Sequence, residues 1–497
     1  MASDPIVETA SGRVRGRVEG DAAVFRGIPF ARAQRFEAPG APEPWSGVRA
    51  AHAYGAAPPQ SSDALLARLG LFPTEPQSED CLALNVWTPA CDAARRPVLV
   101  WIHGGAFACG AGSLPLYDAR RLATRGDAVV VTSNYRVGAL GFLQHPALGA
   151  DANRGLLDQI AALDWVCAHA DRFGGDPANV TVFGESAGAG SICALLAMPA
   201  ARGRFRRAIV QSAAPNGMID AAVAADRAER LAAKLGGVAR LREAAVESLL
   251  EAQGALVLAG PWKMDMPFLP VVDGSSLPAF PVASVLGEGV DLAIGTTDDE
   301  MRLYAYFEAP ESIGEAEVLR RLAWELPGAG DAPRVYAAFR AIRAARGAPH
   351  APADLLWAIQ TEVRLRHHST RIAEARADRG LRTFVYRFGW RSPDEQGRLG
   401  ACHAVDLPFT FGNLDAPGMA AFAGGGAEAE SLARDWMDAW CAFARTGDPS
   451  HRGIGAWPAY DRGRRATLHF GTPRALRDAP DDEERAVLAS VDWAAVP

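Results

Sequence analysis

Residues 179–190 read Asn-Val-Thr-Val-Phe-Gly-Glu-Ser-Ala-Gly-Ala-Gly. Apolar and β-branched residues come first, and Ser186 then stands between Gly184 and Gly188 before a run of small residues. The pattern G-x-S-x-G is typical of a sharp turn from a strand into a helix, which exposes a serine hydroxyl at the edge of a sheet. The alternative is a glycine-rich turn without chemistry, so a reactive Ser186 requires partners elsewhere in the chain.

Predicted strands alternate with predicted helices along most of the chain. Continuous apolar runs, as expected for strands covered on both faces, predict strands at 97–102 and 128–132. Further strands are predicted at 180–184, 207–211, 292–295 and 383–388, and helices at 154–170, 187–197 and 428–446. This alternation favours the α/β class, with one large, mostly parallel central sheet flanked by helices. Short β-like runs within residues 12–30 predict a small antiparallel N-terminal sheet.

The whole chain, residues 1–497, is predicted to form a single domain. No repeat or low-complexity linker divides it. Residues 220–290 and 305–380 are helical in pattern and lie between predicted strands. We therefore expect them to be cap-like insertions that cover the active-site end of the sheet, and not separate domains.

Composition and charge argue against several classes of function. The chain carries 51 Lys and Arg against 58 Asp and Glu, a net charge of −7, and no basic block, so no nucleic-acid partner is expected. No apolar run is long enough for a membrane span, and the first residues lack a secretory pattern, so we expect a cytoplasmic protein. The seven cysteines are irregularly spaced without a C-x-x-C pair, which favours buried free thiols over a zinc or redox site.

A reactive serine needs a base, usually a histidine held by a carboxylate, and hydrogen-bond donors for an oxyanion. Candidate donors lie in His103-Gly104-Gly105-Ala106, which follows a predicted buried strand upstream of Ser186. Glycine there lets the main chain approach a substrate, with the N–H groups of Gly105 and Ala106 as donors. The N–H of Ala187, directly after the serine, is a third candidate. The alternative is a tight turn after a strand.

Four segments together carry a resemblance to a known family. They are residues 78–85, 101–107, 173–188 and 442–449, which read SEDCLALN, WIHGGAF, FGGDPANVTVFGESAG and AFARTGDP. The chain resembles the type-B carboxylesterases, which include bacterial carboxylesterases and the cholinesterases. The resemblance implies an α/β-hydrolase fold, a Ser–Glu–His triad in that order, a small-molecule ester as substrate, and neither a metal nor an organic cofactor.

The acid of such a triad follows a strand in a segment like residues 295–301, Gly-Thr-Thr-Asp-Asp-Glu-Met. The residues alone favour none of the three acids, because acidic side chains in a loop commonly face solvent. The resemblance places the catalytic acid at Glu300, with Asp298 and Asp299 as local competitors.

The histidine is chosen from ten in the chain. His403 lies in residues 399–409 after the predicted strand 383–388, where the resemblance implies the catalytic histidine. His103, beside the candidate oxyanion loop, is the main rival, and the resemblance gives it a role in shaping that loop. His367 and His368 lie in an Arg-rich helical segment and are predicted to be surface residues.

The resemblance implies a carboxylic ester hydrolase that forms an acyl-enzyme on Ser186. The same triad acting on amides, carbamates or lactones is an alternative. A second alternative is a non-catalytic cholinesterase-like binding protein, but such relatives have lost triad residues that this chain retains. We expect a monomer or a weak homodimer.

Several further residues have structural interpretations. By resemblance, Glu79 pairs with Arg35, and Cys81 corresponds to a cysteine that forms a disulfide in secreted relatives. No cysteine precedes Cys81 here, so that disulfide cannot form. A small set of aromatic residues could line a substrate gorge or simply belong to the core: Phe107, Trp262, Tyr304, Phe307 and Phe411.

Overall fold

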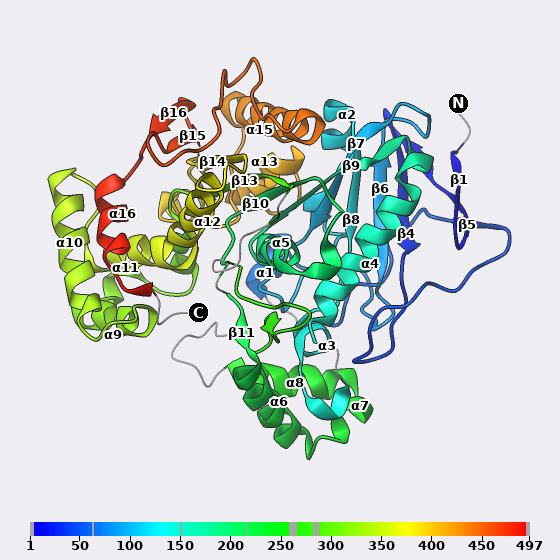
Figure 1. Ribbon diagram of the computed structural model, residues 1–497, viewed down its shortest axis with the longest axis horizontal. Coiled ribbons are helices and arrows are strands. Elements are labelled where there is room, and N and C mark those ends of the chain that lie inside the picture. The colour runs from blue at the N-terminus through cyan, green and yellow to red at the C-terminus, as the bar shows by residue number, and fades with distance from the viewer. Residues whose placement is uncertain are drawn as a thin grey trace.

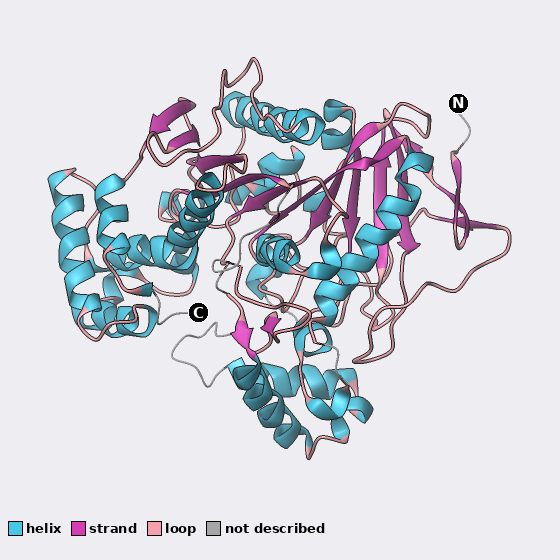
Figure 2. Cartoon of the chain, viewed as in Figure 1, coloured by secondary structure: helices cyan, strands magenta, loops and turns pink. Residues whose placement is uncertain are grey.

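The structure is a computed structural model that describes residues 4–61, 64–149, 152–215, 217–257, 266–281, 287 and 289–493. Its centre is a twisted sheet with helices on both faces (Figures 1 and 2). Within the described residues this sheet has 11 strands in the order β16-β15-β14-β13-β10-β9-β7-β8-β6-β4-β3. In sequence order the bounds are β3 Arg17–Glu19, β4 Ala22–Pro29, β6 Ala83–Thr88, β7 Arg96–Ile102, β8 Val129–Ser133, β9 Gly175–Glu185, β10 Arg207–Gln211, β13 Asp291–Thr297, β14 Thr383–Phe388, β15 Ala466–Phe470 and β16 Ala475–Asp478.

The middle of the sheet is parallel and its edges are antiparallel. Every neighbouring pair from β15 to β8 is parallel, whereas β16, β6, β4 and β3 pair in antiparallel fashion. Parallel strands present their carboxyl ends at the same edge, where open α/β sheets place their binding sites. The prediction of an α/β fold with a large, mostly parallel sheet is confirmed.

A small separate sheet lies beside the N-terminus, as predicted, but it differs in composition. β1 (Ile6–Thr9) and β2 (Gly12–Arg15) are antiparallel, and β5 (Val48–Ala50) adds to β2 in parallel. Residues 17–29, assigned above to this sheet, instead form the antiparallel edge of the large one. Short strands of both sheets have the same alternating sequence pattern. Which sheet such a strand joins is decided by its long-range pairing, which the pattern does not show.

Alternating side chains divide the core into two apolar layers. On one face Val98, Val100 and Val182 pack with the helices α4 (Arg154–His169) and α5 (Ala187–Ala197). On the other face Leu99 and Trp101 pack with α2 (Arg120–Gly126) and α15 (Ala427–Thr446). Strands buried on both faces explain the continuous apolar runs in the sequence.

Two helical regions extend beyond the sheet (Figure 1). One follows β11 (Ile219–Asp220) and contains α6 (Ala221–Leu235), α7 (Arg240–Glu243) and α8 (Val246–Val257), with β12 (Val271–Val272) after it. The other contains α9 (Glu315–Glu325), α10 (Asp331–Ala345), α11 (Pro352–Thr361), a π-helical turn (Glu362–Arg366) and α12 (His367–Ala377), and α16 (Asp482–Ala489) contacts α10. The remaining α-helices formed by the described residues are α1 (Ala64–Arg68), α3 (Gly138–Phe142), α13 (Leu407–Phe411) and α14 (Met419–Phe422).

None of the helices formed by the described residues combines the length and the apolar character needed to cross a membrane.

Candidate active site

Ser186 occupies a strained turn between β9 and α5. Its φ is +57°, a left-handed value that non-glycine residues seldom adopt. A Cβ at Gly188 would lie 2.0 Å from the carbonyl oxygen of Ile102, and one at Gly184 would lie 2.7 Å from the same oxygen. Both glycines are therefore needed for β7 to pass this close to the turn. The strain is a property of the loop that presents the serine.

His403 bridges Ser186 and Glu300. Its Nε2 lies 2.8 Å from Ser186 Oγ, and its Nδ1 lies 2.6 Å from Glu300 Oε2. In the sequence, His403 is 217 positions from Ser186 and 103 positions from Glu300. Ser186 follows β9, Glu300 follows β13 and His403 follows β14. The structure brings the three predicted residues together at the carboxyl edge of the parallel strands.

Glu300 is completely buried and acts as an acceptor on both oxygens. Its Oε1 accepts a hydrogen bond from the Thr297 N–H at 2.7 Å, while Oε2 faces His403. Burial opposes ionisation of the carboxyl group, but the hydrogen bond and the charge of His403 outweigh it, so the pKa of Glu300 lies below its usual value. Glu300 is thus an anion next to the imidazole at neutral pH.

Main-chain contacts hold the acid loop and the histidine loop in register. The N–H of His403 donates to the carbonyl of Glu300 at 3.0 Å. Two residues earlier, Ala401 donates to Asp299 Oδ2 at 3.0 Å, and its carbonyl accepts from the Asp299 N–H at 2.9 Å. The two loops therefore cannot shift independently. The sequence presents Asp299 only as a competitor for the acid, and no sequence signal predicts its contact with Ala401.

The predicted oxyanion donors lie in a loop of unusual main-chain conformation next to the serine. Gly105 and Ala106 have φ values of +112° and +56°. A Cβ at Gly104 would lie 3.2 Å from Ser186 Cβ, so this loop passes directly beside the serine. No described residue accepts a hydrogen bond from the N–H groups of Gly105, Ala106 or Ala187. These three donors are available to a ligand.

Glu185, within the serine motif itself, was missed as a site residue. The side chain is buried, and its Oε1 lies 3.1 Å from His403 Nε2. Burial raises the pKa of Glu185 above its usual value. Burial also opposes protonation of His403, but the negative charges of Glu185 and Glu300 outweigh it and raise the pKa of His403. The glutamate of G-E-S-A-G is the signal that could have identified this second carboxyl group.

The competing acids and histidine have other partners. Asp298 Oδ2 lies 2.8 Å from His469 Nε2, and Asp299 binds the histidine loop as described above. His103 is fully buried, its ring stacks on Tyr135 at 4.2 Å, and its Nδ1 lies 2.8 Å from the carbonyl of Gly104. Burial lowers the pKa of His103 to about 4. This neutral imidazole supports the glycine loop.

The prediction that His367 and His368 are surface residues is wrong. They are 7% and 2% exposed, and both rings pack against Trp493. Burial lowers the pKa of His367 to about 3 and that of His368 to about 4, so both are neutral. The neighbouring arginines suggested an exposed helix face, whereas the residue that covers it comes from the far end of the chain.

The aromatic residues considered for a gorge differ in environment. Phe411 is fully buried against Trp101, and Phe107 is buried against Phe142, so both belong to the core. Phe307 is 48% exposed. Trp262 lies outside the described residues.

Two structural expectations concern ion pairs and thiols. Arg35 and Glu79 form the expected salt bridge, with Arg35 Nε 2.9 Å from Glu79 Oε2. None of the seven cysteines, all of which the structure describes, forms a disulfide, and Cys81 is buried.

One group of side chains away from this site has the composition of a metal site. The potential ligand atoms of Asp435, Asp438 and His451 lie within 4.8 Å of one another. Both His451 nitrogens already hydrogen-bond, Nε2 with the Asp435 carbonyl and Nδ1 with the Gly453 N–H. The two carboxylates pair with arginines. The cluster is therefore satisfied by its own partners.

Comparison with known proteins identifies the family of this chain. Residues 3–487 match the Carboxylesterase family. Para-nitrobenzyl esterase of Bacillus subtilis (strain 168) is 38% identical, over 97% of this chain and 98% of its own. Phenmedipham hydrolase of Pseudarthrobacter oxydans is 36% identical, over 95% and 96% of the two chains. The crystal structure of a carboxylesterase of Geobacillus stearothermophilus superposes with a TM-score of 0.85 at 39% identity, covering 97% of this chain and 99% of that chain. The chain therefore belongs to the carboxylesterase family of ester hydrolases.

Proposed function

We propose that this protein is a serine esterase in which Ser186 is acylated by a carboxylic ester, His403 transfers the protons and Glu300 is the acid of the triad. The observation that carries the proposal is the imidazole of His403, which lies within hydrogen-bond distance of both Ser186 Oγ and Glu300 Oε2. A serine hydroxyl becomes a useful nucleophile when a positioned base removes its proton.

Acylation follows from these positions. Ser186 Oγ attacks the ester carbonyl carbon while His403 Nε2 accepts the hydroxyl proton, and the carbonyl π electrons move to oxygen. The resulting imidazolium lies against the Glu300 carboxylate, which stabilises its charge. The tetrahedral intermediate then collapses, the alkoxide leaves with the proton from His403, and an acyl-serine ester remains.

Deacylation repeats the sequence with water. His403 accepts a proton from water as the oxygen attacks the acyl-serine, and it returns a proton to Ser186 Oγ when the carboxylic acid leaves. In both halves we assign the oxyanion to the N–H groups of Gly105, Ala106 and Ala187. Each such donor contributes about 10²–10³ in turnover in comparable hydrolases.

Turnover of p-nitrophenyl acetate and butyrate, measured beside Ser186→Ala, tests the proposal. We expect release of p-nitrophenol by the unmodified protein, and a loss in the variant of about 10⁶ in kcat, as in other triad hydrolases. The serine substitution removes one hydroxyl from a partly exposed residue, so its melting temperature serves as the folding control. Equal turnover by both proteins would contradict the proposal.

A further inference from the structure

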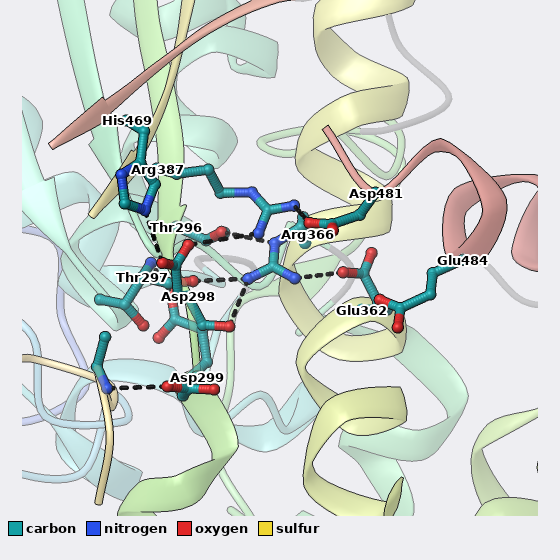
Figure 3. A network of polar contacts seen from close by, with 12 residues as sticks. Thr296, Thr297, Asp298, Asp299, Glu362, Arg366, Arg387, His469, Asp481 and Glu484 are labelled. Atoms are coloured by element: carbon teal, nitrogen blue, oxygen red, sulfur yellow. Dashed lines mark hydrogen bonds and ion pairs between the residues drawn. The ribbon is translucent and has the colours of Figure 1, made fainter. Parts of the chain in front are cut away.

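A network of buried and partly buried polar side chains surrounds residues 296–298, just before Glu300, and it includes Arg366 of the π-helical turn (Figure 3). We propose that Arg366 is a positioning residue. It fixes the loop after β13, so that the carboxylate of Glu300 stays aligned with His403. This inference rests on the proposed role of Glu300 as the acid of the triad.

Arg366 holds the main chain of the acid loop. Its Nη2 donates to the carbonyls of Thr297 and Asp298 at 2.7 and 2.9 Å, and its Nε donates to Thr296 Oγ1 at 3.1 Å. The N–H of Thr297 donates to Glu300 Oε1 at 2.7 Å. Thr297 is therefore held at its N–H by Glu300 and at its carbonyl by Arg366, so a movement of this residue displaces the carboxylate.

A guanidinium group is the side chain suited to this task. It presents several N–H donors in one rigid plane, whereas a lysine ammonium is a point charge on a flexible stem. The remaining Nη1 of Arg366 pairs with the carboxylate of Glu362, and the two side chains are only 11% and 6% exposed. This ion pair compensates the buried charge, which would otherwise be costly.

The π-helical turn explains how one helix reaches the loop on both sides of Glu300. Thr361 Oγ1 accepts a hydrogen bond from the Met301 N–H at 3.2 Å, just after Glu300, while Arg366 binds the residues before it. At 3.6 residues per turn, residues five apart on an α-helix point in directions about 140° apart. The wider i→i+5 turn over Glu362–Arg366 reduces that separation, so that Thr361 and Arg366 both face the loop.

The side chain of Asp298 in the acid loop is held by residues of the sheet strands β14 and β15, whereas Arg366 binds the main chain of the loop. Asp298 Oδ2 is bound by His469 Nε2 at 2.8 Å, and its other oxygen lies 3.6 Å from Arg387 Nη1. Arg387 in turn donates to Asp481 Oδ2 at 2.8 Å. Among these basic groups, Arg366 is the one that donates to the carbonyls of both Thr297 and Asp298.

The decisive variant is Glu362→Gln/Arg366→Met, because it removes the ion pair as a unit and leaves no buried charge unpaired. The matched control is Glu325→Gln/Arg364→Met. Arg364 belongs to the same turn and binds Glu325 of α9 through two hydrogen bonds of 2.9 and 3.1 Å. Each protein is assayed for kcat and KM with p-nitrophenyl butyrate and for its melting temperature. The control removes an ion pair of the same turn that joins it to α9 and not to the acid loop, so it reports what the loss of such a pair alone does to turnover.

We expect the Arg366 double variant to lose at least about tenfold in kcat with KM changed by less than about threefold, because misplacement of a catalytic group acts on the transition state. The control is expected to keep kcat within about twofold. Arg366→Lys is expected to lie between the unmodified protein and the double variant. The low-field proton resonance of the His403–Glu300 hydrogen bond should shift or broaden in the Arg366 variants but not in the control.

An Arg366 double variant with unchanged kcat and an unchanged low-field resonance would overturn the inference. If the double variant does not fold, Arg366→Lys and Thr361→Val are measured in its place. Full kcat in both of these variants would likewise overturn the inference. The proposed function fails separately, through equal turnover by the unmodified protein and Ser186→Ala. The proton resonance still tests Arg366 in that case, since it requires no turnover.

Discussion

Replacing Glu300 by glutamine perturbs the partner of His403 without changing the size of the side chain. In the structure one carboxylate oxygen accepts from the Thr297 N–H at 2.7 Å, and the other lies 2.6 Å from His403 Nδ1. The amide of glutamine has a single acceptor oxygen and a donor NH₂ group. Because the Thr297 N–H can only donate, the oxygen turns toward Thr297 and the NH₂ group faces His403.

The consequence is the wrong tautomer of His403. Opposite a donor, Nδ1 is left without its proton, and the proton moves to Nε2, which lies 2.8 Å from Ser186 Oγ. A protonated Nε2 cannot accept the proton of the serine. The corresponding acid-to-amide change in a serine protease lowers kcat about 10⁴-fold, and we expect a loss of that size, about 5.4 kcal/mol in the activation barrier.

Steady-state turnover of p-nitrophenyl butyrate by Glu300→Gln measures this loss, with the melting temperature as a check on folding. Asp298→Asn is the matched control, because the Asp298 side chain binds His469 and not His403. We expect the control to lose less than about tenfold in kcat. The tautomer argument is refuted if Glu300→Gln keeps more than about a tenth of the unmodified kcat, or if the control loses as much.

Three further predictions concern the oxyanion loop, the pH profile and stability. Gly105→Ala should lower kcat by about 10²–10³, since the added Cβ would lie 2.2 Å from the Cys109 carbonyl oxygen and displace a donor; unchanged kcat for a phenyl ester would contradict this. The acidic limb of kcat/KM should lie above about pH 6.5, because a raised pKa keeps His403 protonated to higher pH, and Glu185→Gln should move the limb to lower pH by removing a negative charge. A pH–rate series of the unmodified protein and Glu185→Gln measures the shift, and a limb that moves to higher pH in the variant would contradict this prediction. Glu79→Gln should lower the melting temperature with little change in kcat, as calorimetry beside an esterase assay would show, because Arg35 binds Glu79 and the carbonyls of Arg242 and Ala244 and no triad residue.

The sequence was most informative where one local pattern requires one structure. The apolar run at 97–102 and the small residues after Ser186 predicted β7 and α5 closely, because a strand buried on both faces and a glycine-flanked turn leave few alternatives. Glu300 was different. Three acids in one loop are equivalent by residue type, and it was the resemblance to a family that distinguished them. The structure shows that only Glu300 among them faces His403.

Long-range contacts account for what could not be predicted. His367 and His368 are covered by Trp493, which is more than a hundred residues away, so their own segment reads as an exposed helix. Arg366 reaches Thr296 and Thr297 across about seventy residues through a π-helical turn, for which periodicity gives no signal. The edge strands before residue 30 pair with the large sheet through β6. In each case the deciding partner is distant in sequence.

Mass spectrometry after reaction with an organophosphonate fluorophore tests the central claim most directly. Phosphonate transfer needs an activated nucleophile but no natural substrate, so the result is independent of which ester the protein prefers. We predict one adduct, on the peptide that contains Ser186, with loss of turnover in proportion to labelling and no adduct in Ser186→Ala. An adduct that persists in Ser186→Ala, or a labelled protein that retains full turnover, would contradict Ser186 as the nucleophile.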